Sequence, residues 1–187
     1  MRYKSRFLLH SVFAIAFAVA LTSMALPVWA QQPEVSPKAV ERIQKAVRHE
    51  LVMLPFLTVF DNLAFKVDGY NVTLLGQITN PTLKYDAEKA VKRIEGVEKV
   101  DNQIEVLPPA PIDSRLRRQL YRAIYGYPAL QKYSLSPQKP IRIIVKNGHV
   151  TLEGVIDSDA DKNLATIRAN GVPGIFSVDN NLQVVKP

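Results

Sequence analysis

The 187-residue sequence has no cysteine, one tryptophan and three histidines. The missing cysteines exclude disulfide scaffolds, thiolate metal sites and thiol nucleophiles. His49 and His149 are not part of an H-x-x-x-H motif, and neither a G-x-S-x-G motif nor a phosphate-binding glycine loop occurs. We therefore expect His49 and His149 to be solvated surface residues, in a protein without cofactor, metal site or enzymatic activity.

Three aspartates alternate at Asp157, Asp159 and Asp161, a spacing that is similar to the start of a calcium loop. The downstream glycine and bidentate glutamate of such a loop are missing. Aspartates are also favoured near the start of a helix, where they cap free N–H groups and oppose the helix dipole. We favour this capping interpretation over a metal site.

A helix that crosses a bilayer takes about 20 apolar residues, and the wholly apolar run over residues 12–21 is well short of that. Basic residues precede this run, and Val28-Trp29-Ala30 follow it. This order predicts a secretory signal peptide over residues 1–30, cleaved before Gln31, rather than a membrane anchor. Because no cysteine follows for lipid attachment, we expect a soluble periplasmic protein and not a lipoprotein.

Two sequence blocks recur at a spacing of 78 residues. V-T-L-x-G over residues 72–76 returns over 150–154, and G-V-x-x-V-D-N-x-I-x-V over 96–106 returns with conservative changes over 174–184. The chain between the copies is rich in proline, which favours an extended spacer. The repeat predicts a domain over residues 36–107, a linker over 108–111 and a second domain over 112–187.

Each copy has the same order of expected elements. In copy 1, Val40, Ile43, Val47 and Leu51 recur at helical spacing, and two strand-like segments around a turn follow them. A last alternating strand closes each copy, after a second helical stripe that we expect at Leu83, Ala87, Ala90 and Ile94 in copy 1 and at Ala160, Leu164, Ile167 and Gly171 in copy 2. We expect an α+β fold of two tandem αββαβ units, each a three-stranded mixed sheet with two helices packed on one face.

The two expected hairpin turns differ in sequence. In copy 2, Asn147-Gly148 comes two residues before the valine of V-T-L, whereas in copy 1 this valine comes three residues after the glycine of Asp68-Gly69. A one-residue slip would turn every side chain of the strand to the other face. We therefore expect copy 1 to absorb Tyr70 or Asn71 in a longer loop or a bulge.

Four glycines recur in the repeat and are expected to be structural. We expect Gly76 and Gly154 on the helix-covered face of the sheet, where the missing side chain lets a helix come close; a bulge glycine is the alternative. Gly96 and Gly174 open the second repeated block, after the second helix of each copy.

The combined pattern resembles the BON domain: an amphipathic helix, V-x-V-x-x-G-x-V-T-L-x-G-x-V, a second helix ending in G-V-x-x-V, and a closing N-x-I-x-V strand. The resemblance runs from about Lys38 to Val185. It implies the fold given above, a place in the bacterial envelope, protection against osmotic stress and binding to phospholipid membranes, and it implies no catalytic residue. The chain differs from lipoprotein members of the family in having no cysteine for a lipid anchor.

Arginines and tyrosines gather in the first helix of copy 2. At 100° per residue three of the arginines share one stripe, and the apolar residues share another. At about 1 kcal/mol per basic residue near an anionic surface, they would support weak, peripheral, salt-sensitive binding to anionic phospholipid; an ordinary solvated helix face is the alternative. The candidate membrane and anion-binding residues are Arg115, Arg117, Arg118, Arg122, Tyr121 and Tyr125.

Two further alternatives stay open at this point. A protein-interaction or chaperone-like module would dock an envelope protein through an exposed sheet edge or an apolar loop. The apolar segment Leu51–Phe60, which Pro55 interrupts, is core, a domain interface or a membrane contact. Export argues against nucleic acid as the partner of the arginines.

Overall fold

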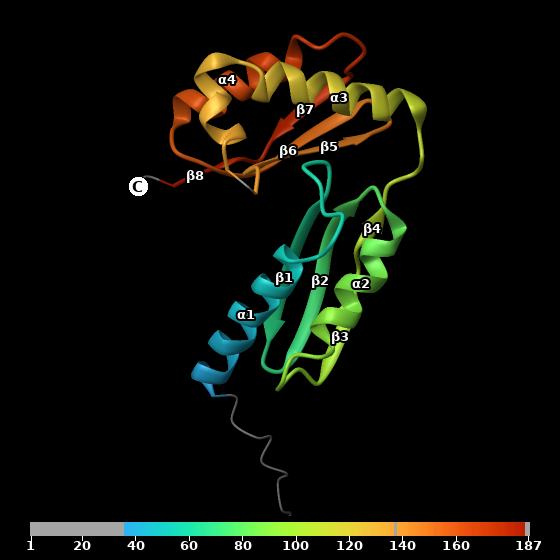
Figure 1. Ribbon diagram of the computed structural model, residues 1–187, viewed down its shortest axis with the longest axis vertical. Helices are drawn as coiled ribbons and strands as arrows, with labels where there is room; N and C mark the ends of the chain where they lie inside the picture. Colours follow the sequence, from blue (N-terminus) through green and yellow to red (C-terminus); the bar gives the residue numbers. More distant parts are fainter. Residues whose placement is uncertain (1–35, 137, 186–187) are drawn as a thin grey trace, which may run out of the picture. The chain divides into compact units, whose positions relative to one another are not determined.

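The computed structural model describes residues 36–136 and 138–185 (Figure 1). The predicted signal peptide lies outside this part of the chain. The structures formed by copy 1 and copy 2 are called repeat 1 and repeat 2 from here on. Repeat 1 follows the expected order of elements, with the last strand in two parts. Its elements are α1 (Pro37–Val52), β1 (Asn62–Asp68), β2 (Asn71–Ile78), α2 (Pro81–Val91), β3 (Lys99–Asn102) and β4 (Glu105–Val106).

Repeat 2 has the same order with one addition, the short 3₁₀ helix η1 between its first helix and its first strand. The first helix begins at Pro111, the residue that the repeat predicts as the last of the linker. Proline suits this place because its fixed φ and missing N–H fit the first turn of a helix. The elements are α3 (Pro111–Tyr125), η1 (Pro128–Ser134), β5 (Ile141–Lys146), β6 (His149–Ile156), α4 (Asp159–Asn170), β7 (Ser177–Asn180) and β8 (Gln183–Val184).

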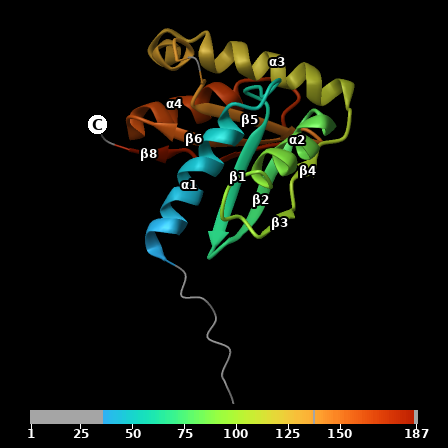
Figure 2. The same ribbon diagram turned by 60° about the horizontal axis from the view of Figure 1, so that its bottom comes forward.

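The expected mixed sheet is confirmed in both repeats. In repeat 1, β2 is the central strand, antiparallel to β1 and parallel to β3 and β4, as Figure 2 shows. In repeat 2, β6 lies in the same way between β5 on one side and β7 and β8 on the other. Each pair β3/β4 and β7/β8 is one interrupted strand, so each sheet has three strands in width.

An asparagine explains why the last strand is interrupted. The Asn102 side-chain oxygen accepts a hydrogen bond from the Ile104 N–H at 3.2 Å, and its amide nitrogen donates to the Lys84 carbonyl in α2 at 2.8 Å. Asn180 makes the equivalent bonds to Leu182 and Lys162, at 3.0 and 2.9 Å. The asparagine of the repeated V-D-N motif therefore ties the strand to the second helix of each repeat.

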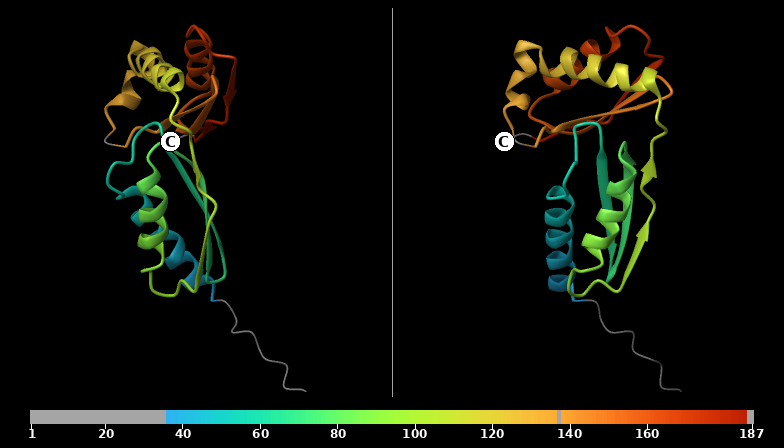
Figure 3. Two further views of the ribbon diagram at one scale, coloured as in Figure 1. Left: turned by 90° about the vertical axis from the view of Figure 1, so that its right-hand side faces the viewer. Right: turned by 45° about the vertical axis from the view of Figure 1, so that its right-hand side comes forward.

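The apolar stripes of α1, α2 and α3 lie where their spacing predicts. The stripe expected on α4 is wrong: Ile167 is 65% exposed, and the buried residues of this helix are Ala165 and Ala169. Both helices of each repeat cover one face of its sheet (Figure 3), because their buried residues form one cluster with the inward-facing residues of the central strand. In repeat 1 the buried residues from α1, β2 and α2 are Ile43, Val47, Leu51, Val72, Leu74, Ile78, Leu83, Ala87 and Val91.

The expectation of an extra residue in the first hairpin is wrong. Asp68 pairs with Asn71 around the two-residue turn Gly69-Tyr70, just as Lys146 pairs with His149 around Asn147-Gly148. Gly69, with φ 59°, is the one residue of its turn that has a positive φ. In the second turn both residues have a positive φ, 52° at Asn147 and 78° at Gly148. The Asp-Gly pair therefore begins one position before the turn, and no bulge is needed.

The close approach at Gly76 and Gly154 comes from the neighbouring strand and not from a helix, which corrects our expectation. Both glycines have positive φ, 115° and 123°. A Cβ on Gly76 would lie 2.0 Å from the Asn62 carbonyl oxygen, and one on Gly154 would lie 1.9 Å from that of Pro140. Only a residue without a side chain fits these positions.

The segment Leu51–Phe60 contacts the cores of both repeats. Leu54 and Leu57 pack against the core of repeat 1, and Val59 and Phe60 pack against that of repeat 2. The Val59 carbonyl also accepts a hydrogen bond from the Ile143 N–H of β5 at 2.9 Å. Among the three alternatives, these contacts support the domain interface. No helix within the described residues is long and apolar enough to cross a membrane.

Candidate functional site

Three of the four candidate arginines form an exposed stripe on α3, which we call the arginine stripe: Arg115, Arg118 and Arg122. On the opposite side of the helix, Leu116 and Leu120 are completely buried. The two sides separate because apolar residues at a spacing of about four direct one face of the helix to the core. The predicted division of α3 into a basic face and an apolar face is therefore confirmed.

Arg117 does not belong to this exposed surface, which corrects the prediction that grouped it with the stripe. Only 6% of the residue is exposed, and its guanidinium donates a hydrogen bond to the Val145 carbonyl of β5 at 2.6 Å. Burial lowers the pKa of Arg117, and the nearby carboxylates of Asp113 and Asp61 act in the opposite direction. Arg117 therefore stabilises the fold of repeat 2 and is not accessible to a surface anion.

Tyr125 is also buried, which corrects its prediction as a membrane-binding residue. Its hydroxyl donates to the Ile141 carbonyl at 2.7 Å and accepts from the Ile141 N–H at 3.0 Å. Burial raises the pKa of Tyr125 far above its usual value, and the Ile141 hydrogen bond opposes this shift. Tyr121 is only half-buried, with its ring 6.4 Å from that of Phe60, and stays beside the arginine stripe.

Replacing Tyr125 by phenylalanine is expected to lower the free energy of unfolding by about 1.5 kcal/mol, because the N–H and carbonyl of Ile141 would lose their buried partner. Urea unfolding followed by circular dichroism measures this loss. Tyr85→Phe is the matched control: Tyr85 is 65% exposed on α2, so its change should be small. Equal losses in both variants would contradict the structural role of the Tyr125 hydroxyl.

A shallow apolar hollow of about 390 Å³ lies beside the arginine stripe. Val59, Phe60 and Tyr121 form its apolar part, and Arg118 and Arg122 complete its lining. A surface of this kind offers positive charge and apolar contact side by side. It therefore fits an amphiphilic anion better than an inorganic one.

Two of the three alternating aspartates, Asp157 and Asp161, are engaged by protein groups, and Asp157 forms an ion pair with Lys132 at 3.0 Å. The Asp161 carboxylate accepts hydrogen bonds from Tyr133 and Ser158, both at 2.8 Å, and forms an ion pair with Lys132 at 2.9 Å. Burial alone would raise the pKa of Asp161, but the hydrogen bonds from Lys132, Tyr133 and Ser158 outweigh it and lower the pKa. Ser158 caps α4 by accepting from the Asp161 N–H. Within residues 36–136 and 138–185 no cluster of metal-ligating side chains is present.

His49 and His149 are both exposed, as expected, and His149 Nδ1 lies 2.8 Å from the Ser177 hydroxyl.

Two residues near the N-terminal end of α3 were missed by the sequence analysis. Asp113 is buried and accepts hydrogen bonds from the N–H groups of Asn147 and Gly148 at 2.8 and 2.9 Å. Phe176, by contrast, is 77% exposed. The position of Asp113 in a first helical turn was the only sequence signal for either residue.

The repeated αββαβ fold and its motifs define the class of protein. The chain matches the BON domain over residues 39–108 and again over 113–186, so it belongs to the BON domain family as a tandem member. It is similar to the osmotically-inducible protein Y of Escherichia coli (strain K12), with 26% identity over 133 residues. That alignment covers 65% of this chain, and the chain spans only 61% of the length of this relative.

Two solved structures of CdsD, a structural protein of the type III secretion system of Chlamydia trachomatis, also resemble the chain. The first has 15% identity and a TM-score of 0.28, covering 78% of this chain and 93% of that one. The second is the C-terminal domain of CdsD, with 14% identity and a TM-score of 0.27, covering 75% of this chain and 96% of that one. With TM-scores this low, they carry no conclusion about function.

Proposed function

We propose that this chain is a non-catalytic periplasmic protein that binds anionic phospholipid surfaces through the arginine stripe of α3. The observation that carries the proposal is the exposure of all three arginines on a helix face whose opposite side is core. The acidic residue of α3, Asp113, is buried and bonded to backbone N–H groups, so it does not neutralise this face locally.

A role in envelope maintenance under osmotic stress is part of the proposal. It is supported by membership of the BON family and by the name of the relative, osmotically-inducible protein Y. The relative is longer than the matched region, so its role as a whole protein comes to this chain only as a proposal. The signal peptide expected over residues 1–30 supports export to the periplasm.

The expected binding is weak, reversible and sensitive to salt. Three arginines near an anionic surface contribute about 3 kcal/mol together, because each contributes about 1 kcal/mol. The Debye length falls from about 10 Å at 0.1 M salt to about 3 Å at 1 M, so most of this attraction is screened at high salt. Peripheral attachment of this kind suits a protein that samples membrane surfaces and is released from them.

The triple variant Arg115→Ala, Arg118→Ala, Arg122→Ala is expected to bind phosphatidylglycerol-containing vesicles about a hundredfold more weakly at low salt. Sedimentation with these vesicles, and with pure phosphatidylcholine vesicles, measures the effect. The fold should be unchanged, because all three side chains are exposed.

A charge-matched control comes from the first helix of repeat 1. Arg42→Ala, Lys45→Ala, Arg48→Ala removes three exposed basic residues from α1 and lowers the net charge by the same amount. We expect this variant to retain most of the binding. Equal losses in the two triple variants would assign the attraction to net charge, and binding without preference for anionic lipid would contradict the proposal.

A protein-interaction module is the second candidate function. Met53 and Phe56 favour it because these two large apolar side chains, just after α1, are 65% and 75% exposed. Crosslinking from position 56 in cells separates the two functions. One dominant protein partner would favour docking, whereas crosslinks to lipid alone would count against it.

A further inference from the structure

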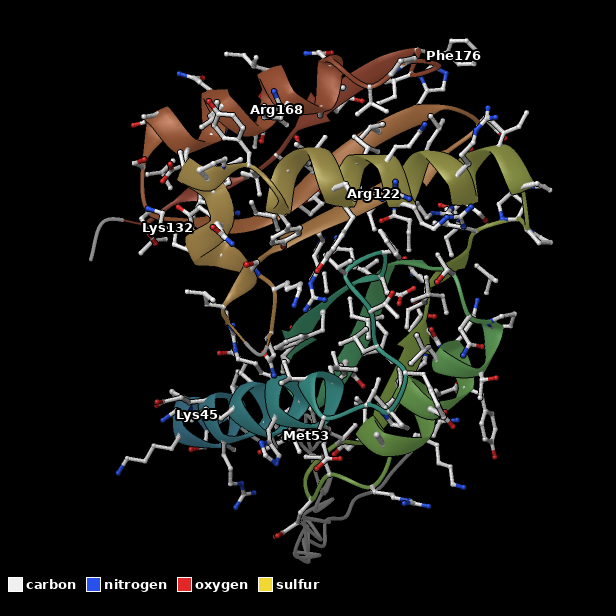
Figure 4. The ribbon with its side chains drawn as sticks, turned by 45° about the horizontal axis from the view of Figure 1, so that its top comes forward. Lys45, Met53, Arg122, Lys132, Arg168 and Phe176 are labelled. Carbon is white, nitrogen blue, oxygen red and sulfur yellow. The ribbon has the colours of Figure 1, made fainter. Side chains whose placement is uncertain are left out.

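Phe176 of repeat 2 combines an exposed aromatic ring with a backbone and a ring contact to the hairpin turn next to it. The residue lies between α4 and β7, and its ring stands clear of the ribbon in Figure 4. Its N–H donates to the Gly148 carbonyl at 2.9 Å, and its ring lies 5.7 Å from that of His149. A Cβ on Gly148 would lie 2.8 Å from a Phe176 ring carbon, so the glycine leaves room for the ring.

Repeat 1 shows that the fold does not require an aromatic residue at this place. Glu98 is the equivalent residue: it also precedes the last strand, and its N–H donates to the Tyr70 carbonyl of the first hairpin turn at 2.9 Å. The backbone is the same, but repeat 1 presents an exposed carboxylate where repeat 2 presents an exposed phenyl ring. Packing of the domain therefore does not require a phenyl ring at position 176, and a contact outside the domain would account for it.

The N-terminal part of α3 lies at the same end of repeat 2 as Phe176. The Asp113 carboxylate accepts hydrogen bonds from both N–H groups of the Asn147-Gly148 turn, which lies against the Phe176 ring. A Cβ on Gly174 would lie 3.6 Å from Leu116 Cδ2 of α3. On these same helical turns Ile112 is 62% exposed and Arg115 is exposed. Apolar and cationic side chains thus occur together at this end of the domain.

We propose that Phe176, together with Ile112 from the N-terminal turn of α3, inserts into the interfacial region of an anionic bilayer while the arginine stripe contacts the lipid headgroups. This inference rests on the proposed function and adds an apolar anchor and an orientation to it. Charge complementarity identifies the membrane as the occupant, because the exposed stripe on α3, the helix that carries Ile112, is cationic. Aromatic and aliphatic side chains beside basic residues are the composition that inserts at such an interface.

The test introduces a fluorescent reporter at the two equivalent positions, in the full chain. Phe176→Trp is compared with Glu98→Trp, its matched control in repeat 1, on vesicles of phosphatidylglycerol and phosphatidylcholine. Trp29, the sole tryptophan of the natural sequence, lies in the predicted signal peptide and is retained or removed in both variants alike, so a difference between them reports the new side chain. Emission wavelength, quenching by brominated lipid and sedimentation are measured in the same samples.

We expect emission from Phe176→Trp to shift to shorter wavelength and to be quenched by brominated lipid, whereas Glu98→Trp should show neither change. Phe176→Glu, which copies the repeat 1 residue, should fold normally and bind about tenfold more weakly, because a partly inserted phenyl ring is lost. Its thermal unfolding midpoint checks the fold.

The failures of the two proposals are distinguishable. If Phe176→Trp sediments with the anionic vesicles but shows neither shift nor quenching, the inserted anchor is wrong and binding through the arginine stripe still stands. Equal shifts in Phe176→Trp and Glu98→Trp would also overturn the anchor. If the wild-type protein does not sediment with anionic vesicles, the proposed function and the anchor both fail.

Discussion

Replacing Asp61 by alanine is expected to lower the free energy of unfolding by about 4 kcal/mol, because a buried carboxylate and all its hydrogen bonds are lost together. Asp61 is only 1% exposed. It accepts from the N–H and hydroxyl of Thr58 at 2.9 and 2.6 Å, and from the N–H and hydroxyl of Thr79 at 2.6 and 2.8 Å. The carboxylate therefore joins the segment before β1 to the end of β2.

The same segment also contacts repeat 2, so the loss should extend beyond repeat 1. The Thr58 carbonyl accepts from the Arg142 guanidinium at 2.9 Å, next to the Val59 bond with Ile143. We expect the transition of the Asp61→Ala variant in urea to be broader as well as earlier, since coupling between the repeats weakens.

Two companion variants calibrate this result. Asp61→Asn keeps one acceptor oxygen and should lose roughly half as much stability. Asp68→Ala removes an exposed carboxylate at the end of β1 and should change the stability by less than about 0.5 kcal/mol. A loss below about 1 kcal/mol in Asp61→Ala would show that water replaces the carboxylate without cost, contrary to its burial.

The two repeats satisfy one shared backbone group with different side chains. In repeat 1 the N–H at the end of the central strand, that of Thr79, bonds to Asp61. In repeat 2 the equivalent N–H, that of Asp157, donates to the Tyr133 hydroxyl at 3.0 Å. Tyr133 comes from η1, an element that repeat 1 does not have. The spacing of the repeat predicts the shared strands, but it carries no information on partners that come from unlike segments.

The same limit separates the correct and incorrect parts of the site prediction. Apolar spacing predicted which side of α3 faces the core, and the exposure of Arg115, Arg118 and Arg122 follows from it. Arg117 and Tyr125 flank the core side, and each reaches a backbone group of β5. Helical spacing gives the direction of a side chain but not the carbonyl that it meets, so a polar residue next to the core is easily assigned to the surface.

Gly154→Ala is expected to lower the stability of repeat 2 by about 4 kcal/mol, because steric strain and an unfavourable backbone conformation act together at this position. The residue has φ 123°, which alanine rarely adopts, and its Cβ would lie 1.9 Å from the Pro140 carbonyl oxygen. The neighbouring atom is backbone, so relief requires β5 and β6 to separate where Ile141 pairs with Gly154.

Hydrogen exchange of the β5 and β6 amides, measured alongside urea unfolding, locates this loss in repeat 2. Gly171→Ala is the matched control: Gly171 has an ordinary φ of −74°, and its added Cβ would be 3.6 Å from the nearest carbonyl oxygens. It should be neutral or slightly stabilising, since alanine restricts the unfolded chain. Gly76→Ala should reproduce the large loss in repeat 1, because its Cβ would meet the Asn62 carbonyl oxygen at 2.0 Å. If Gly154→Ala were as stable as Gly171→Ala, the strand contact would not be the reason for glycine in the repeated V-T-L-x-G motif.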